Sequence, residues 1–486
     1  MSGLKTMLVA VNAKYVHTNI AVRYISRLCK EYNIDCEFSE FTINEPLDNV
    51  LRKLYAADCD AYGFSCYIWN IEYILKLAKL LKKIRPERKI FLGGPEVSYS
   101  ADELIKKDFI DFIVSGEGEY AVKKLIESSF SEKPIIYGEK PESLDELPFP
   151  YSLDDLKEAV KNEKLVYYET SRGCPFNCSY CLSSVESGVR FMPLDRVKKE
   201  LLLFASSGVK TVKFVDRTFN ADKKRAFEIW KYCMTIEGDT CFHFEIGADL
   251  LTDEQIDLLK NAPLGKFQFE IGVQTTNPDT IKEISRTMDI ERLSKNVRRL
   301  KEETNVLLHL DLIAGLPYED LEVFKKSFND VYGLSPDVLQ LGFLKLLKGS
   351  EMRNRADEYG MCFSDFAPYE VFSTSWLSFS DLSRLKAVED VFERYYNSAR
   401  FTRTLPKALE RFSSPFDFYE KLSLYWQKNG LLGQGVKRIS LYSHLYEFLK
   451  SVLKEEDLAP IMELMKKDFT DWHSKGEGTP EWYKKY

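Results

Sequence analysis

Short apolar runs alternate with amphipathic stretches over the first quarter of the chain. The apolar runs occupy residues 7–11, 35–41, 61–65, 89–92 and 112–114, and the amphipathic stretches occupy residues 19–32, 47–57, 71–85 and 101–107. Short apolar runs favour buried strands, whereas apolar positions that recur every three or four residues favour helices. We therefore predict an α/β domain at residues 1–133, built as a doubly wound parallel sheet of the flavodoxin-like type.

The same alternation returns in the middle of the chain. Apolar runs occupy residues 165–170, 211–216, 243–248, 266–273, 307–313 and 338–344, and helical patterns occupy residues 222–236, 253–261 and 290–303. This pattern predicts a partial (β/α)6 barrel at residues 161–350, with its chemistry at the carboxyl ends of the strands. Residues 134–160 contain four prolines and are predicted to be a linker.

The periodicity changes after residue 350. Residues 351–486 are rich in Phe, Tyr and Trp, with helical runs at residues 379–398, 416–428 and 441–453. We predict a separate C-terminal helical domain. Its aromatic residues either close over the barrel mouth and form a substrate pocket or fill a core between packed helices. A mildly basic run either meets an anionic substrate or is a solvated helix face; it comprises Arg400, Arg403, Lys407 and Arg411.

Composition limits the class of protein. The chain has 486 residues, 44% hydrophobic content, 29% charged residues and a formal net charge of -7, as expected for a soluble globular protein. This charge argues against a broad electrostatic grip on nucleic acid, although a local basic patch stays possible. No stretch predicts a membrane span or a signal peptide. The ten cysteines form no regular framework, so we expect the reducing cytoplasm.

The most specific chemical pattern is a group of three cysteines. Cys174, Cys178 and Cys181 follow the apolar run at residues 165–168 with C-x3-C-x2-C spacing. Three thiolates from one loop suit a [4Fe-4S] cluster with one open iron. The alternatives are a zinc site or buried thiols, but a closed zinc site needs a fourth ligand, and Cys233 lies too far along the chain to be a local one.

This loop resembles the signature of the radical S-adenosylmethionine (SAM) enzymes, including an aromatic residue, Tyr180, before the last cysteine. The resemblance implies that the open iron binds SAM and that an electron from a donor such as flavodoxin or ferredoxin cleaves it to a 5'-deoxyadenosyl radical. It also implies SAM contacts at Tyr180, Asp216, Glu270, Gln274, Arg286 and Gly315. The alternative for these carboxylates and the arginine is ordinary hydrogen bonds or a surface ion pair. His243 and His309 are either acid–base groups inside the barrel or hydrogen-bonded core residues.

The predicted N-terminal sheet should carry a ligand beyond the carboxyl ends of its strands. Glycines follow two of these strands, in the stretches Gly93-Gly94-Pro95-Glu96 and Gly116-Glu117-Gly118-Glu119. With their position before the cysteine loop, they resemble the cobalamin-binding module of the cobalamin-dependent radical SAM enzymes. The contacts that this resemblance implies are Asn12, Tyr15, His17, Ser65, Cys66, Tyr67, Gly93, Gly94, Pro95, Glu96, Gly116 and Glu117.

Two details of this region leave alternatives open. The Asp-x-His-x-x-Gly cobalamin motif is absent, so His17 either ligates cobalt or makes a loop hydrogen bond. The methylthiotransferases also place a sheet domain before the barrel, but they hold a second cluster there with three rim cysteines. Only Cys66 is predicted on the rim, and one ligand cannot hold such a cluster. All four cysteines of this domain, Cys29, Cys36, Cys59 and Cys66, are therefore expected to be core or bystander residues.

The resemblance implies a methyltransferase that uses a [4Fe-4S] cluster, SAM and cobalamin on an unactivated substrate centre. The alternatives are a rearrangement, cyclisation or redox reaction without methylation, or an N-terminal sheet that serves only as a docking module. Residues 393–401 resemble part of an uncharacterised domain that accompanies some of these enzymes. The substrate is not indicated by the sequence.

Overall fold

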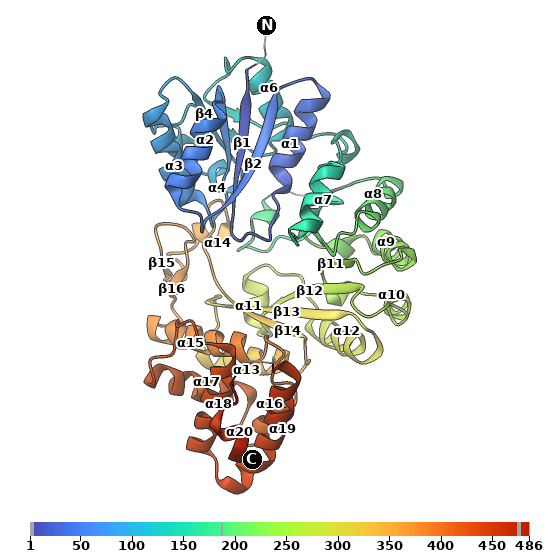
Figure 1. Ribbon diagram of the computed structural model, residues 1–486, viewed down its shortest axis with the longest axis vertical. Coiled ribbons are helices and arrows are strands. Elements are labelled where there is room, and N and C mark those ends of the chain that lie inside the picture. Colours follow the sequence, from blue (N-terminus) through green and yellow to red (C-terminus); the bar gives the residue numbers. More distant parts are fainter. Residues whose placement is uncertain (1–3, 186–187, 474–477, 486) are drawn as a thin grey trace.

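The computed structural model describes residues 4–185, 188–473 and 478–485. Two parallel sheets and a group of helices follow one another along the long axis of the molecule (Figure 1). The first sheet has the strand order β2-β1-β3-β4-β5-β6, and the second has the order β14-β13-β12-β11-β10-β7. The predicted fold class is confirmed, with the two sheets and the C-terminal helices in the predicted sequence order.

The first sheet is covered by helices on both faces. Its strands are β1 (Thr6–Asn12), β2 (Cys36–Thr42), β3 (Ala61–Ser65), β4 (Lys89–Gly93), β5 (Phe112–Ser115) and β6 (Ile135–Tyr137). Its helices are α1 (Ile20–Glu31), α2 (Leu47–Ala57), α3 (Ile71–Ile84), α4 (Pro95–Ser98), α5 (Ala101–Leu104) and α6 (Glu119–Glu127). Every residue of β1 is buried, and Val9 and Leu8 belong to separate hydrophobic clusters on opposite faces. Such a sheet offers ligands only its strand ends.

Strand β6 lies in the segment that was predicted to be a linker. It is only three residues long, follows Pro134 and forms the edge of the sheet beside β5. A proline has no N–H for a strand ladder, which is tolerated at the start of an edge strand. Because the segment is rich in proline, the sequence pattern did not reveal this short strand, which is the last strand of the first sheet.

The second sheet is an open barrel. Its strands are β7 (Val166–Tyr168), β10 (Thr211–Phe214), β11 (Cys241–Ile246), β12 (Phe267–Gln274), β13 (Leu307–Ala314) and β14 (Val338–Phe343). The helices around it are α7 (Leu153–Lys161), α8 (Leu194–Ser206), α9 (Lys223–Thr235), α10 (Asp253–Leu259), α11 (Pro278–Glu283), α12 (Ile290–Glu303) and α13 (Leu321–Tyr332). A small hairpin, β8 (Ser171–Gly173) and β9 (Val189–Phe191), flanks the cysteine loop.

Side chains alternate across this second sheet. Along β12, Phe267, Phe269, Ile271 and Val273 are buried in the core, while the residues between them are half-buried. Because successive strand side chains point to opposite faces, the residues between them line the concave side. We call this side the inner face of the barrel. It is the face that can carry charged groups along the strands and not only at their ends.

The C-terminal residues form a helical unit and a hairpin. The elements are α14 (Glu351–Asn354), β15 (Cys362–Phe363), β16 (Val371–Ser373), α15 (Phe379–Tyr395), α16 (Thr404–Leu409), α17 (Pro415–Lys428), α18 (Arg438–Val452), α19 (Glu455–Trp472) and α20 (Glu481–Lys485). Aromatic side chains such as Tyr395, Tyr419 and Trp426 are fully buried. Phe328 of α13 contacts Phe392, which seats the helices on the outer layer of the barrel. The structure therefore places these aromatic residues in a core.

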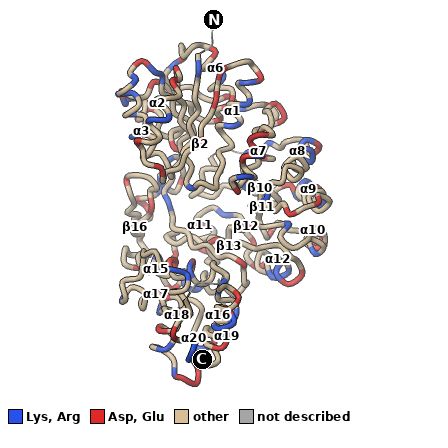
Figure 2. The backbone as a smooth tube through the Cα atoms, viewed as in Figure 1, with Lys and Arg blue, Asp and Glu red and all other residues tan. Residues whose placement is uncertain are grey.

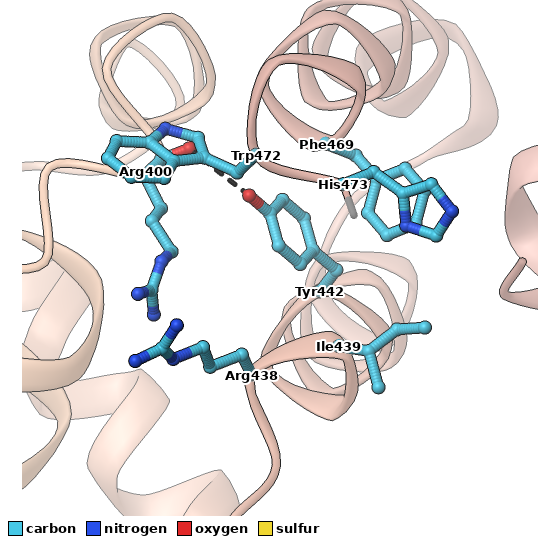
Figure 3. Close-up of a pocket in the computed structure, with 7 residues that line it drawn as sticks. All are labelled: Arg400, Arg438, Ile439, Tyr442, Phe469, Trp472 and His473. Carbon is cyan, nitrogen blue, oxygen red and sulfur yellow. Dashed lines mark hydrogen bonds between the residues drawn. The ribbon is translucent and has the colours of Figure 1, made fainter. Parts of the chain in front are cut away.

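Charged residues are interspersed over the helices of all three parts (Figure 2). In the predicted basic run, Arg403 pairs with Asp468 and Asp471, and Arg411 pairs with Asp457. Arg400 instead lines a small pocket between α18 and α19, with Arg438, Tyr442 and Trp472 among its neighbours (Figure 3). None of the helices within the described ranges combines the length and the apolar character that crossing a membrane requires.

Candidate active site

The cysteine loop begins directly after the first barrel strand and is held by its glycines. Gly173 has φ +99°, and a Cβ at this position would lie 2.1 Å from the carbonyl oxygen of Gly188. Only glycine fits this crossing of β8 and β9. The backbone N–H of Cys181 donates to the carbonyl of Cys178 at 3.0 Å, which folds the last cysteine back toward the middle one. The sequence thus fixes the loop by local contacts.

The three cysteines are free thiols with different surroundings. Cys178 is buried, whereas Cys174 and Cys181 are partly exposed. Burial raises the pKa of Cys178, and the guanidinium of Arg286, whose Nη1 lies 3.8 Å from Cys178 Sγ, opposes that rise. Across the described ranges, no group of three His, Cys, Asp or Glu side chains is gathered around one point. The donor chemistry still fits, because thiolates are the ligands that iron–sulfur clusters take.

Beside Cys178 lies a group of polar atoms that lack partners. Arg286 donates from Nη1 to the hydroxyl of Tyr180 at 3.2 Å and from Nη2 to the carbonyl of Gly272. Its Nε and the Oε1 atom of Gln274 are buried without a hydrogen bond. Unpaired buried polar atoms are costly, so they indicate a polar ligand. The carboxylate and ribose hydroxyls of SAM match this need, and the residues at the barrel mouth fit that cofactor.

Asp216 follows the end of β10, and Gly315 follows the end of β13, with β11 and β12 between these two strands in the barrel. The buried carboxylate of Asp216 accepts hydrogen bonds from the backbone N–H of Thr170 at 2.9 Å and from the hydroxyls of Thr170 and Ser171, each at 2.6 Å. Asp216 therefore anchors the start of the cysteine loop, a role that the sequence analysis did not assign. Gly315 has φ +97° and turns the chain at the end of β13.

Glu270, which the resemblance implied as a SAM contact, lies on the inner face of the barrel in the middle of β12. Its Oε2 accepts from Lys213 Nζ at 2.9 Å and from His243 Nε2 at 3.0 Å. Burial opposes ionisation, but these two partners prevail and lower the pKa of Glu270 to about 2. The carboxylate is therefore ionised and occupied by the protein itself.

The inner face holds further ionisable groups. His309 Nε2 lies 3.2 Å from Asp311 Oδ1, so both barrel histidines have carboxylate partners. Lys213 and Glu245 were missed by the sequence analysis. The signal that reveals Glu245 is the alternation of apolar and polar residues in β11, which directs it to the same face as His243.

The rim of the first domain faces the barrel, and its glycines have a structural reason. Gly94 has φ +112°, and a Cβ there would lie 2.5 Å from the carbonyl oxygen of Cys66. The neighbouring loop that carries Cys66 therefore requires a glycine at this position. Gly93 has ordinary space around it, Pro95 begins α4, and Gly116 has φ +85°.

The thiols of the first domain do not form a second cluster site. Cys29, Cys36, Cys59 and Cys66 are all buried, and burial strongly raises the pKa of the Cys66 thiol. Cys66 Sγ donates to the carbonyl of Phe64 at 3.5 Å. The Cys66 thiol is therefore directed into the domain, as expected for a core cysteine, and offers the rim no ligand.

Other rim residues make hydrogen bonds within the rim or to the barrel. His17 Nδ1 lies 2.7 Å from the hydroxyl of Tyr167 on β7, and Asn12 Nδ2 donates to the carbonyl of His17 at 3.0 Å. The loop hydrogen bond is thus the role that the structure gives His17. Ser65 lies beneath this loop, with its hydroxyl 3.5 Å from Asn19 Nδ2.

Aromatic side chains form the open part of the rim. Tyr15 is 60% exposed and Trp69 is 43% exposed. Trp69 stacks on Tyr67 with ring centroids 4.4 Å apart and an angle of 8° between the planes. Flat exposed rings at the strand ends suit a flat macrocycle, so the rim fits cobalamin. Trp69 is a further rim residue that the sequence analysis did not single out.

The two predicted rim carboxylates are engaged by other parts of the chain. Glu96 accepts a hydrogen bond from Tyr369 of the segment between β15 and β16. Glu117 pairs with Arg172 at 2.7 Å and with Arg190. Both side chains therefore hold the first domain against later segments, which differs from the predicted direct contact with cobalamin.

Arg172 joins the rim to the cysteine loop. Its Nη1 and Nη2 bind Glu117 and Glu119 of the rim at 2.7 and 2.5 Å, and its Nε binds Glu169 at 2.9 Å. The guanidinium is largely buried, and one cation serves three carboxylates. Arg172 stands two residues before Cys174, so this ion-pair group fixes the rim relative to the cluster loop.

Comparison with known families agrees with this geometry. Residues 7–126 match a model described as a B12 binding domain, and residues 168–331 match the radical SAM superfamily. Residues 357–486 match a model described as a protein of unknown function, DUF4080. The chain therefore combines a B12-binding domain with a radical SAM domain, as the cysteine loop and the rim predicted, and residues 357–486 match an uncharacterised domain.

Several known proteins are similar over part of their length. One is the 2-(S-pantetheinyl)-carbapenam-3-carboxylate methyltransferase of Streptantibioticus cattleyicolor, 27% identical over 57% of this chain and 44% of its own length. Another is an uncharacterized methyltransferase of Pyrococcus horikoshii, 33% identical over 43% of this chain and 51% of its own length. This chain thus spans about half the length of these curated relatives.

A solved structure shares the fold. The cobalamin-dependent SAM radical enzyme OxsB with aqua-cobalamin bound has a TM-score of 0.66 and 14% identity, covering 100% of this chain and 83% of that one. At this identity the similarity concerns the arrangement of the domains.

Proposed function

We propose that this chain is a cobalamin-dependent radical SAM methyltransferase acting on an unactivated centre of its substrate. One observation carries the proposal: the rim of the B12-binding domain is fixed to the cysteine loop by the ion pairs of Arg172. Two cofactors held on these two segments would face the same space. Proximity of this kind is what the transfer of a group between bound partners requires.

The chain's own residues would divide the work as follows. Cys174, Cys178 and Cys181 would hold the cluster, while Arg286 and Gln274 would bind the polar groups of SAM. Tyr15, Tyr67 and Trp69 would bind the flat face of cobalamin. When bound, the cluster would supply the electron that cleaves SAM, and cobalamin would carry the methyl group. The close fit of the rim against the barrel would exclude water from the reacting groups.

Anaerobic reconstitution tests the proposal. The full chain is reconstituted with iron, sulfide and hydroxocobalamin and then incubated with SAM and a reductant. We expect about four irons per chain, corrinoid absorbance that survives gel filtration, and 5'-deoxyadenosine. Label from methyl-labelled SAM should be recovered in the corrinoid fraction. Corrinoid without label would favour a reaction without methylation, and absence of corrinoid would favour a docking role for the first domain.

Two single cysteine variants, one in the cysteine loop and one outside it, provide a matched test and control. Cys178→Ala should lose iron and 5'-deoxyadenosine formation but keep the corrinoid. Cys362→Ala changes an exposed cysteine on β15 and should behave as wild type. Iron retained by Cys178→Ala would overturn the cluster assignment.

The electron donor and the cellular location belong to the same proposal. A flavodoxin or ferredoxin would supply the electron, because two of the three cysteines that would hold the cluster are partly exposed. The reducing cytoplasm would suit a chain whose ten cysteines are all free thiols. Reduction by a purified flavodoxin, followed by its semiquinone absorbance, tests the first of these assignments.

A further inference from the structure

The inner face of the barrel carries a compact set of ionisable side chains. Strand pairing places Glu245 of β11 beside Glu270 of β12, and Glu270 beside His309 of β13. In the strand register, Lys213 of β10 lies beside His243 of β11, and His243 precedes Glu245 by two residues on the same strand. All of these positions alternate with core residues, so their side chains share the concave face. The set consists of Lys213, His243, Glu245, Glu270, His309 and Asp311.

The cations of this set are already engaged. Lys213 and His243 both bind Glu270, and His309 faces Asp311 at 3.2 Å. Glu245 is different: within the described part of the chain it makes no hydrogen bond and no ion pair. The inner face therefore has one carboxylate more than its cations satisfy. A half-buried carboxylate that makes neither a hydrogen bond nor an ion pair gains from a ligand that supplies one.

The surroundings of Glu245 favour a positive charge. Burial, followed by the like charge of Glu270, raises the pKa of Glu245 to about 7. Arg217 and Lys213 oppose this rise, while Asp311 adds to it. A cation placed among Glu245, Glu270 and Asp311 would be attracted by all three carboxylates. Apolar substrate surface would instead leave Glu245 without a partner.

We propose that Glu245 binds a protonated amino group of the substrate on the inner face of the barrel, so that the substrate is a small polar amine. The proposal rests on the proposed function, in which the substrate enters this barrel between the cluster loop and the rim. It names the chemical class of the substrate and a specificity residue. A sterol-like or fatty substrate does not fit a surface of this charge.

Binding of matched probes tests the proposal on the full chain reconstituted with its cluster. The probes are cyclohexylamine, cyclohexanol and cyclohexanecarboxylate, compared by ligand-observed NMR at about pH 8. We expect the amine to bind best and to lose about tenfold in affinity in Glu245→Gln. Glu254→Gln, an exposed carboxylate on α10, serves as the control and should bind like wild type. Glu245→Asp keeps the charge and should retain most of the affinity.

The pH dependence gives a second measurement. Cyclohexylamine stays protonated, so its affinity should rise about tenfold between about pH 6 and pH 8 as Glu245 ionises, and this rise should vanish in Glu245→Gln. Equal binding of the amine and the alcohol, or unchanged amine binding in Glu245→Gln, would overturn the proposal. The probes need neither cobalamin nor SAM cleavage, so failure of the proposed methyl transfer would leave this result intact.

Discussion

The two parallel sheets of this chain handle charge in opposite ways. The first sheet is buried on both faces, and β1 has no exposed residue along its length. The second is covered by helices on one face only, and β12 alternates between buried and half-buried residues. Within the first sheet, charged residues occur only on the edge strand β2 and at the start of β4, whereas the second sheet carries them along its central strands. For this reason the proposed cobalamin contacts lie at the rim of the first domain, whereas the proposed substrate contact lies along the strands of the barrel.

A charge placed inside the first sheet should cause the largest loss of unfolding free energy. Val9 is fully buried in the middle of β1, so Val9→Asp should cost about 4 kcal/mol of unfolding free energy, because the carboxylate has no partner there. Val9→Thr keeps the shape and should cost about 1 to 2 kcal/mol. Urea unfolding measures both. A Val9→Asp variant as stable as Val9→Thr would show that this sheet admits charge.

The ion pairs between the domains come next. Arg172→Met leaves Glu117, Glu119 and Glu169 close together without their shared cation. Removing one partner from a buried ion-pair group costs about 3 kcal/mol, so we expect a loss of this size and a separate unfolding step for the first domain. Arg172→Lys keeps the charge but not the three-way geometry and should lose less than half as much. Calorimetry of wild type, Arg172→Met and Arg172→Lys measures these losses. An Arg172→Met variant that unfolds like wild type would contradict the prediction.

Within the barrel, Glu270→Gln should destabilise by about 2 kcal/mol at neutral pH, because Lys213 and His243 lose their shared carboxylate. The pKa of Glu270 is lowered to about 2, so its stabilising effect is complete above the ordinary glutamate value and is lost as the pH falls toward 2. The difference between wild type and Glu270→Gln should therefore shrink on acidification. A difference that stays constant with pH would contradict the ion-pair assignment.

The cysteine loop could be singled out from the sequence because its residues are local. Cys174, Cys178 and Cys181 lie within eight positions of one another, and their spacing carries the chemistry. Periodicity predicted most of the strands and helices, because an eight-residue strand such as β12 shows the alternation of buried and half-buried residues clearly. Strand β6 was missed because three residues after a proline show no period.

The direction of individual side chains could not be predicted in the same way. Glu96 and Glu117 stand at the predicted strand ends, yet their partners, Tyr369 and Arg172, come from distant parts of the sequence. Lys213 belongs to a four-residue strand, too short to reveal which face it occupies before its neighbours are known. Long-range partners of this kind arise from tertiary packing, which local patterns do not encode.

Glu245 and Glu270 lie side by side on the inner face, and the same substitution should act on them with opposite sign. Glu245 has a raised pKa of about 7, so its ionisation opposes folding: the favourable protonated form is complete below the ordinary glutamate value and is lost as the pH rises through 7. Glu245→Gln should therefore stabilise the protein by about 1 kcal/mol near pH 8, discounted for partial exposure. Below about pH 4, where Glu245 is protonated in both states, the variant and wild type should be equally stable. Urea unfolding at both pH values measures the effect. Destabilisation near pH 8 would mean that a protein cation already pairs with Glu245, and the vacancy for a substrate amine would then not exist.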